Sequence, residues 1–343
     1  MSLVDALRAA LAEACSPWAE APFEALPDRG LAHLHLRLVG SGVLARVPKQ
    51  SQMDLPAAAN LAYQAACFER ASASGHAPRL HGVLQPSPAL PRGALLVEEI
   101  IGMPARLPHD LAAIADALAA LHSLPLPAAQ ARAPLLDAAD PLAELSGQID
   151  AQAVHLDAAR LDPASRQAIE ARRAALATHC ARAGRSPKRL IAFDAHPGNF
   201  IVRGDGRAVL VDLEKARYGL PPLDLAHATL YTSTTWDAAS SALLSVAEVR
   251  DFQSRWLARC DGASAWQDEL LPLRSAMWLW SITWCAKWRV LSSHEARGGG
   301  DGEDWSDGNS EAALVAHVRG RVDHYLSPQG VARVMAELDA LGG

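Results

Sequence analysis

One segment, from Arg189 to Ala216, constrains the fold more than any other part of the chain: RLIAFDAHPGNFIVRGDGRAVLVDLEKA. Its apolar runs Phe200–Val202 and Ala208–Val211 have β character, and an Asp205-Gly206 turn signal lies between them. Asp-Gly between two apolar runs is a strong short-range signal for a β-hairpin. The segment therefore predicts two antiparallel strands joined by a tight turn.

Three polar side chains are predicted to meet at the open end of this hairpin. Asn199 and Asp212 are equidistant from the Asp205-Gly206 midpoint, so they are predicted to lie opposite each other. Asp194 lies five residues before Asn199, on the loop leading to the same end. Each residue alone could cap a loop or turn, but together they suit Mg²⁺. Phosphoryl transfer uses such a set, in which one aspartate takes the hydroxyl proton and Asn and Asp hold magnesium.

The expected secondary structure changes from mainly strands to mainly helices near residue 102. From residue 31 to 101, the strand-like runs HLHLRLV, GVLARV and ALLVEEII flank one helical stretch over residues 56–74. This pattern favours a small antiparallel sheet that carries a helix. After Gly102 the chain is mainly helical, with helices expected over residues 110–124, 140–155 and 163–183. We therefore expect an α+β fold with two lobes, residues 1–101 and 102–343.

Composition narrows the class of partner. The 343-residue chain is half hydrophobic and carries a net charge of −6, which leaves no basic footprint for nucleic acid. Its five cysteines are scattered without a C-x-x-C pair, and no long uncharged apolar run predicts a membrane span. Residues 1–18 form an amphipathic pattern that is unlike a signal peptide. We expect a cytoplasmic protein that acts on a small molecule, without nucleic acid or membrane as partner.

The motif Asp194-Ala-His-Pro-Gly-Asn199, followed by Val211-Asp212-Leu-Glu214, resembles the aminoglycoside phosphotransferase and choline kinase-like family. The resemblance extends over about residues 31–228 and implies the two-lobed protein-kinase-like fold of that family. It also implies the use of ATP and Mg²⁺, with Asp194 as catalytic base and Asn199 and Asp212 as magnesium ligands. By the same likeness, Glu214 is a second acidic position at the metal, acting through water.

Neighbouring positions extend this resemblance and also depart from it. Asp224, within PPLDLA, resembles the aspartate that buttresses the catalytic loop, so we expect a structural role for it. The chain has Ala192-Phe193 where the family has His-Gly, and Phe193 is expected to fill that space by packing. His196 is expected to hydrogen-bond within the loop.

The small lobe is expected to supply the nucleotide contacts. On the strand GVLARVPK, Arg46 resembles the phosphate-binding basic residue of the family, and Lys49 at the strand end is its rival. Gln64 lies on the inward face of the neighbouring helix, where the family has an acid, so we expect a weaker polar contact there. At the hinge between the lobes, the backbone from Glu98 to Ile100 is expected to hydrogen-bond adenine.

The acceptor site is expected in the helical region after Asp224. Trp280, Trp284 and Trp288 recur every four residues, and they either pack the core or form a wall for a cationic amine. The segment over residues 297–307 is either a solvated loop or an attractor of amines. Its acids are Asp301, Glu303, Asp304 and Asp307. Both features favour an amino alcohol or amino sugar as acceptor.

The sequence allows three other interpretations. Ala192-Phe193 and Gln64 favour a catalytically inactive member of the same fold that binds a nucleotide or metabolite. A helical interaction protein would leave the hairpin motif as a coincidence. A protein kinase is disfavoured because the chain has no recognisable D-F-G and A-P-E arrangement. The complete set of Asp194, Asn199 and Asp212 favours the small-molecule phosphotransferase.

Overall fold

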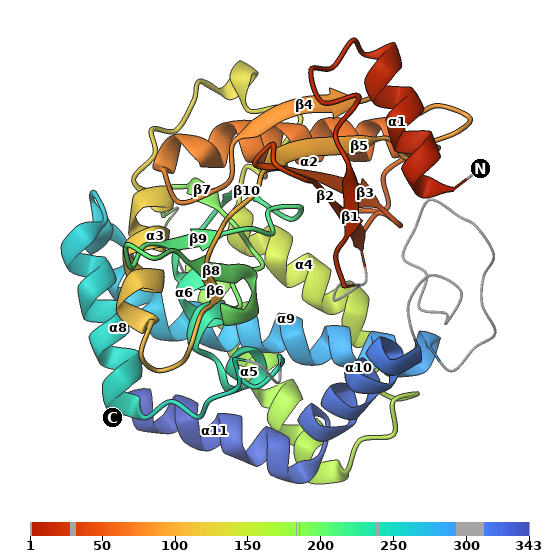
Figure 1. Cartoon of the computed structure of the whole chain (residues 1–343). Helices are drawn as coiled ribbons and strands as arrows, with labels where there is room; N and C mark the ends of the chain where they lie inside the picture. The colour runs from red at the N-terminus through yellow and green to blue at the C-terminus, as the bar shows by residue number, and fades with distance from the viewer. Residues whose placement is uncertain are drawn as a thin grey trace.

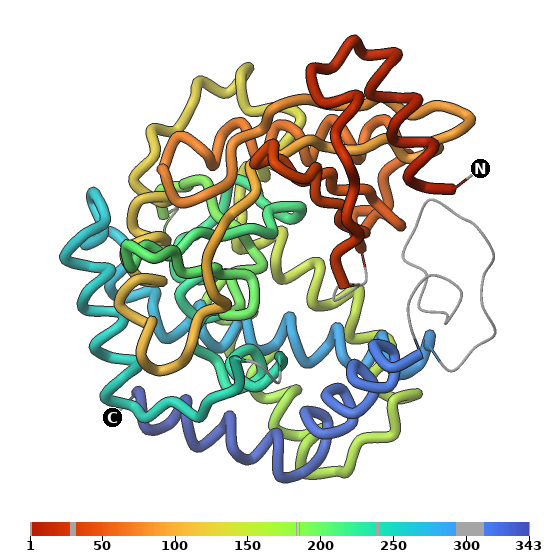
Figure 2. The backbone as a smooth tube through the Cα atoms, viewed as in Figure 1, coloured from red at the N-terminus to blue at the C-terminus, as the bar shows by residue number. Residues whose placement is uncertain are grey.

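The computed structural model describes residues 2–27, 32–182, 184, 186–237, 240–292 and 312–342. These residues form a small lobe built on an antiparallel sheet and a larger, mainly helical lobe (Figure 1). The chain begins in the small lobe and ends on the far side of the large one (Figure 2). The predicted α+β, two-lobed architecture is confirmed.

The small lobe contains a five-stranded antiparallel sheet with the order β1-β2-β3-β5-β4. Its strands are β1 (Phe23–Ala25), β2 (His33–Leu38), β3 (Val43–Pro48), β4 (Leu80–Leu84) and β5 (Ala94–Glu98). The three predicted strand-like runs form β2, β3 and β5. Strand β4 was not predicted, since it is short and only its last residue is fully buried.

Two helices accompany this sheet. Helix α1 (Leu3–Glu13) begins with a capping box in which Ser2 and Asp5 exchange hydrogen bonds, satisfying two N–H groups at its start. Helix α2 (Ala57–Ala71) continues into the 3₁₀ turn η1 (Ser72–Ser74). Gln64 on α2 is buried as predicted, which directs a polar side chain from the small lobe towards the large one.

The large lobe is assembled around helix α9, which packs against α4, α5, α6 and α10 (Figure 1). Its helices are α3 (Leu111–His122), α4 (Pro141–Ala153), α5 (Pro163–Arg182), α6 (Pro222–Thr229), α7 (Tyr231–Thr234), α8 (Val246–Arg259), α9 (Leu270–Leu291), α10 (Ala312–Tyr325) and α11 (Pro328–Gly342). The 3₁₀ turns η2 (Ala129–Ala131), η3 (Pro197–Asn199) and η4 (Ala263–Glu269) lie between them. The three helices predicted after Gly102 are confirmed as α3, α4 and α5.

Five further strands are short and follow the small-lobe sheet in the chain: β6 (Met103–Pro104), β7 (Arg189–Ile191), β8 (Phe200–Val202), β9 (Ala208–Leu210) and β10 (Arg217–Gly219). Strands β6, β8 and β9 form one sheet, and β7 and β10 form a second. Strands β8 and β9 are the predicted hairpin. Because β5 belongs to the small sheet and β6 pairs with β8, the predicted lobe boundary at residues 101/102 falls between β5 and β6.

The register of the hairpin differs from the prediction by one residue. The Val211 N–H donates to the Asn199 carbonyl at 2.9 Å, so Asn199 lies opposite Val211 and not opposite Asp212. The turn causes this shift, because Gly206 adopts a φ of +84° and the loop contains residues 204–206 rather than two residues. Asp212 is the first residue beyond this pair.

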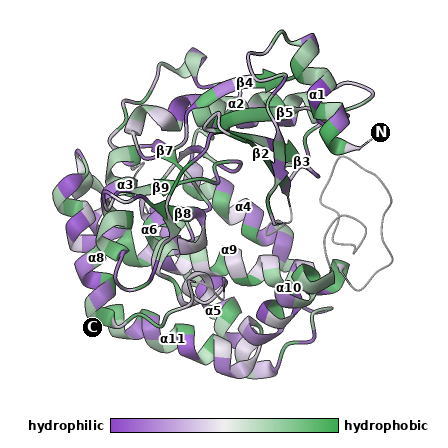
Figure 3. Cartoon of the chain, viewed as in Figure 1, coloured by the Kyte–Doolittle hydropathy of each residue, from purple (hydrophilic) through white to green (hydrophobic). Residues whose placement is uncertain are grey.

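Apolar side chains line the inside of both lobes. In Figure 3 strand β5 of the small lobe is mostly green, whereas the outer helices α8 and α11 alternate between purple and green. This alternation is typical of helices that place one face on a core. None of the described helices combines the length and apolar character that a bilayer span requires.

Candidate active site

The loop that follows β7 is held from behind by Asp224 of α6. The Ala192 and Phe193 N–H groups donate to Asp224 Oδ2 and Oδ1 at 2.7 and 2.8 Å. His122 Nε2 lies 3.0 Å from Asp224 Oδ2, and Trp256 Nε1 lies 3.0 Å from His122 Nδ1. Because an indole N–H can only donate, His122 Nδ1 accepts and its Nε2 carries the proton towards Asp224. The structural role predicted for Asp224 is confirmed.

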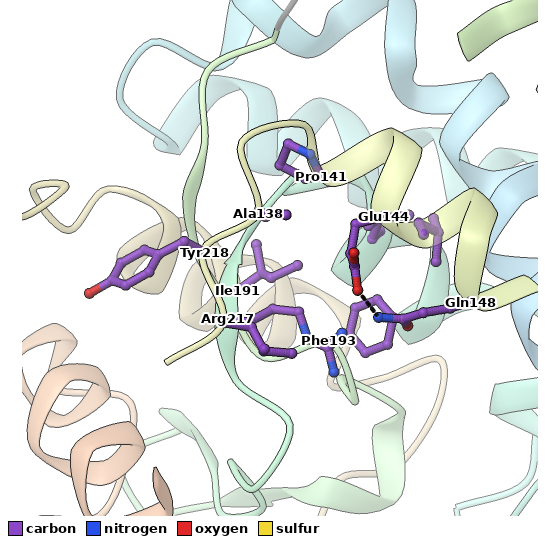
Figure 4. A pocket seen from close by; sticks show the side chains of 12 residues that line it. Ala138, Pro141, Glu144, Gln148, Ile191, Phe193, Arg217 and Tyr218 are labelled. Carbon is purple, nitrogen blue, oxygen red and sulfur yellow. Dashed lines mark hydrogen bonds between the residues drawn. The ribbon is translucent and has the colours of Figure 1, made fainter. Parts of the chain in front are cut away.

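Phe193 adopts a backbone conformation that suits glycine better than a bulky residue, with φ at +61°. Its side chain is almost fully buried. The Phe193 ring packs edge-on against Trp280, with 5.1 Å between the two ring centroids. The guanidinium carbon of Arg217 lies 3.7 Å from the centroid of the Phe193 ring (Figure 4). The expected packing of Phe193 is confirmed.

Asp194 lies beside a lysine and a histidine. Lys215 Nζ lies 2.9 Å from Asp194 Oδ2, and His227 Nδ1 lies 3.7 Å from Asp194 Oδ1. Burial acts to raise the pKa of the Asp194 carboxyl, but Lys215, His227 and His196 outweigh it and hold the pKa below its usual value. Asp194 is therefore ionised at neutral pH and can accept a hydrogen bond or a proton.

His227, one helical turn after Asp224 on α6, is buried beside Asp194. Burial lowers the pKa of His227 to about 4, so the ring is neutral at pH 7. Within the described residues, His227 Nδ1 has no hydrogen-bond partner. Since buried polar atoms are nearly always bonded, this nitrogen is an exception among the buried polar atoms of the described residues.

Hydrogen bonds within the loop fix its other end. Asn199 Nδ2 donates to the Asp194 carbonyl at 2.8 Å, and the Gly198 N–H donates to His196 Nδ1 at 3.2 Å. The loop-bonding role predicted for His196 is confirmed. Because the nitrogen of the Asn199 amide is used in this way, its Oδ1 is the end that remains for a metal ion.

Arg46 of β3 and Asp212 join the two lobes. Arg46 Nη2 lies 2.5 Å from Asp212 Oδ1, and Arg46 Nη1 donates to the Val211 carbonyl at 3.4 Å. Burial acts to raise the pKa of Asp212, but the adjacent guanidinium of Arg46 holds it well below the usual range. The predicted phosphate-binding residue is thus paired with a predicted magnesium ligand.

A polar relay connects Arg46 to α2 and to Glu214. Arg46 Nη2 lies 3.1 Å from His33 Nδ1, and His33 Nε2 lies 2.9 Å from Gln64 Oε1. A guanidinium only donates and an amide oxygen only accepts, so His33 is neutral with its proton on Nε2. Gln64 Nε2 lies 3.5 Å from Glu214 Oε2. Burial, followed by the charge of Asp212, raises the pKa of Glu214 to about 8.

Lys49 is the rival of Arg46 as the phosphate-binding residue. It follows the end of β3, and its N–H donates to the Ala32 carbonyl at 2.7 Å. The side chain of the other candidate, Arg46, contacts Asp212.

Of residues 98–100 at the hinge, one has a backbone N–H without an acceptor among the described residues. The N–H groups of Glu98 and Glu99 donate to the carbonyls of Arg79 and Gly42, each at 2.8 Å. In the part of the chain that the structure describes, no protein group accepts from the Ile100 N–H. Of the predicted hinge donors, Ile100 is therefore the available one.

The three tryptophans spaced four residues apart on α9 differ in burial. Trp288 is buried, as core packing predicts, whereas Trp280 and Trp284 are half-buried. The Trp280 ring holds Lys215 Nζ at 5.7 Å from its centroid, and Trp284 packs edge-on against Trp236 at 5.9 Å. The aromatic face nearest Asp194 thus carries a lysine of the protein itself. The acids predicted to attract an amine lie outside the described residues: Asp301, Glu303, Asp304 and Asp307.

Four contributors to the site were not predicted. Lys215 directly follows Glu214, and His227 lies three residues after Asp224, so the motif spacing could have indicated both. His33 and His122 carried no local signal, because their partners Gln64 and Asp224 lie 31 and 102 residues away.

The donor set suits a magnesium ion bound mainly by phosphate and water. Across the described ranges, no cluster of three or more His, Cys, Asp or Glu side chains has the arrangement of a metal site. Mg²⁺ in nucleotide sites needs only one or two carboxylates besides phosphate oxygens and waters. Asp212 and the Asn199 amide oxygen fit that requirement.

Several solved structures of kinases and phosphotransferases share this architecture. A choline/ethanolamine kinase family protein from Mesorhizobium loti aligns over the full length of both chains, with 18% identity and a TM-score of 0.57. Choline kinase from Cryptosporidium parvum aligns over 99% of this chain and 98% of its own, with 13% identity and a TM-score of 0.57. A mutant aminoglycoside phosphotransferase in ternary complex with ADP and hygromycin B aligns over 95% and 98%, with 13% identity and a TM-score of 0.56. The fold is kinase-like.

The family follows from the sequence. The model of the phosphotransferase enzyme family matches residues 35–270, which is more than half of the chain. The chain therefore belongs to the phosphotransferase enzyme family. A search of curated proteins found no significant match.

Proposed function

We propose that the protein transfers the γ-phosphate of ATP, with Mg²⁺, to a hydroxyl group of a small molecule. One observation carries the proposal: Asp194, Asn199, Asp212 and Arg46 meet where the lobes join, with Asn199 bonded to the Asp194 backbone at 2.8 Å and Arg46 2.5 Å from Asp212. An ionised carboxylate, two oxygen ligands and a fixed cation are the parts that phosphoryl transfer uses.

On the nucleotide side, Asp212 and Asn199 Oδ1 hold magnesium, and Glu214 assists through water. Arg46 exchanges its contact with Asp212 for the phosphates. The Ile100 N–H, with the neighbouring Glu98 backbone, receives the adenine base. Bound magnesium–ATP supplies the phosphoryl group, and the ion neutralises its charge.

On the acceptor side, Asp194 orients the hydroxyl and takes its proton. The unpartnered Nδ1 of His227, 3.7 Å from Asp194 Oδ1, lies where it can bond the same hydroxyl. Lys215 keeps Asp194 ionised until the acceptor binds. Kinases of choline and ethanolamine and a hygromycin B complex among the similar structures favour a hydroxyl-bearing acceptor such as an amino alcohol or amino sugar.

The test is magnesium-dependent ADP release with a panel of amino alcohols, sugars, thiamine and aminoglycosides. An acceptor should stimulate release in the wild type, and Asp194→Asn should lower that rate by about 10²–10⁴-fold. Asp205→Asn changes an exposed carboxylate at the tip of the same hairpin and should leave the rate unchanged. Undiminished turnover in Asp194→Asn contradicts the assignment of the base.

A second candidate is a catalytically inactive member of the family that binds a nucleotide or metabolite. Two ion pairs favour it: Lys215 is paired with Asp194, and Arg46 is paired with Asp212. Nucleotide binding that depends on Asp212 but gives no turnover with any acceptor would support this second function.

A further inference from the structure

Arg46 and His33 are neighbours on one face of the small sheet. Strands β2 and β3 pair antiparallel with His35 opposite Arg46. Side chains alternate between the two faces of a strand, so His33 lies on the same face as His35 and diagonally next to Arg46. Leu36 of β2 points the other way, into an apolar cluster with α1. The sheet therefore turns His33 and Arg46 together towards α2 and the hairpin, and both side chains are buried there.

The bond between His33 and Arg46 does not compete with the ion pair between Arg46 and Asp212. Arg46 Nη2 lies 3.1 Å from His33 Nδ1 and 2.5 Å from Asp212 Oδ1. Each terminal nitrogen of a guanidinium carries two hydrogens, so each contact uses a hydrogen of its own. When a phosphate group takes the place of Asp212, the bond to His33 can persist and hold the guanidinium in position.

Gln64 of α2 determines which nitrogen of His33 accepts from Arg46. Its Oε1 lies 2.9 Å from His33 Nε2, which therefore carries the proton and leaves Nδ1 as the acceptor. On its other side, Gln64 Nε2 donates to Glu214 Oε2 at 3.5 Å. A glutamate at position 64 would have no hydrogen to donate and would place a second carboxylate beside Glu214. An amide on α2 thus fits a site in which a histidine contacts the basic residue.

We propose that His33 is a positioning residue for the nucleotide phosphates. It holds the Arg46 guanidinium while the contact with Asp212 is exchanged for phosphate, in the role that an acid on the neighbouring helix has in protein kinases. A neutral imidazole orients the guanidinium without cancelling its charge, unlike a helix carboxylate. This inference rests on the proposed function, because it describes how Arg46 receives the nucleotide.

The first experiment compares ADP with adenosine on the full-length protein with Mg²⁺, because the difference between their affinities reports the phosphate contacts. Both ligands are titrated by isothermal calorimetry. His33→Leu should lower the affinity for ADP by about tenfold, as expected for one lost hydrogen bond to a charged group, and leave the affinity for adenosine unchanged. Equal changes for both ligands, or an unchanged affinity for ADP, overturn the role of His33. A wild-type protein that does not bind ADP contradicts the proposed function as a whole.

Three further variants separate the hydrogen bond from the bulk of the side chain. His33→Asn keeps a short side chain with an acceptor oxygen and should retain more affinity for ADP than His33→Leu. If His33→Leu does not fold, His33→Phe keeps a ring without nitrogens and should show the same loss. His81→Leu is the control, because His81 is exposed on β4 and packs on Trp18. Equal affinities for ADP in His33→Asn and in the variants without an acceptor overturn the proposal.

Discussion

Behind the loop that carries Asp194, His122 links Trp256 to Asp224, and in front of that loop, His33 links Gln64 to Arg46. Both histidines are neutral, and in each case the partners determine which nitrogen carries the proton. The two networks differ in what lies at their ends. Behind the loop, the carboxylate accepts from backbone N–H groups that stay in place, whereas in front of it a guanidinium and a carboxylate are paired.

Because of this difference, we expect the two networks to contribute to different properties: the rear one to stability and the front one to ligand binding. The rear network is complete, since each donor has an acceptor, and it fixes the backbone that carries Asp194. The front network pairs Arg46 with Asp212, two groups that the proposed reaction needs for phosphate and for metal. It also holds Glu214, with a pKa of about 8, beside Asp212. Changes behind the loop should therefore affect folding, and changes in front should affect ligand response.

The largest effect on stability is expected from Asp224→Asn. The substitution places an amide against backbone N–H groups and the His122 N–H, so buried donors lose their acceptors and about 3–5 kcal/mol of unfolding free energy is lost. Asp212→Asn should cost much less, because the Asp212 side chain is 28% exposed. Urea unfolding of both variants measures this contrast. Equal losses would remove the distinction between the two networks.

A somewhat smaller effect is expected from acidification, through His227. The unfolded histidine binds a proton near pH 6.5, while the folded one remains neutral down to about pH 4. The unfolded state therefore binds more protons in this window, and stability falls by about 3 kcal/mol as the pH drops from 6.5 to 4. Buried His33, whose pKa is also lowered, acts in the same direction. His227→Gln should flatten the pH profile of the unfolding free energy, and an unchanged profile would contradict the assignment.

Magnesium–ATP should stabilise the protein through the front network alone. At a ligand concentration of 100 Kd, binding to the folded state contributes about 2.7 kcal/mol. Thermal unfolding should show this gain in the wild type and lose it with EDTA or in Asp212→Asn. Gln267→Glu, on the 3₁₀ turn η4, serves as a control that should keep the full gain.

The smallest effect is expected from Trp256→Phe. It removes the indole donor and leaves the buried His122 Nδ1 without a partner, at a cost of about 2 kcal/mol. The ligand-induced stabilisation should be unchanged, because Trp256 belongs to the rear network. Parallel calorimetry with and without magnesium–ATP separates the two quantities, and a lost ligand response would show that the networks are coupled.

Much of the fold could be predicted because its signals are local. Periodicity and turn residues predicted the strands β2, β3 and β5, the hairpin, and the helices α2 to α5. The predicted register of the hairpin was wrong by one residue, because the left-handed Gly206 lengthens the turn. Sequence symmetry about Asp-Gly cannot distinguish a two-residue loop from a three-residue one.

The site could be predicted where a motif carries it and not where the lobes meet. The motif placed Asp194, Asn199 and Asp212 on one loop and hairpin. The contact between Arg46 and Asp212 spans 166 residues of sequence, and its geometry depends on how the small lobe sits on the large one. The same is true of His33, whose importance arises only when β2, α2 and the hairpin pack together.

The ion pair between Arg46 and Asp212 also bears on how the lobes move. Because this ion pair already connects the two lobes in the free protein, we expect only a small domain closure when nucleotide binds. Binding then exchanges one bridge for another, and small-angle scattering should find nearly equal radii of gyration with and without magnesium–ATP. Arg46→Met lacks that bridge, so its lobes should swing more widely in the free protein and draw together on binding.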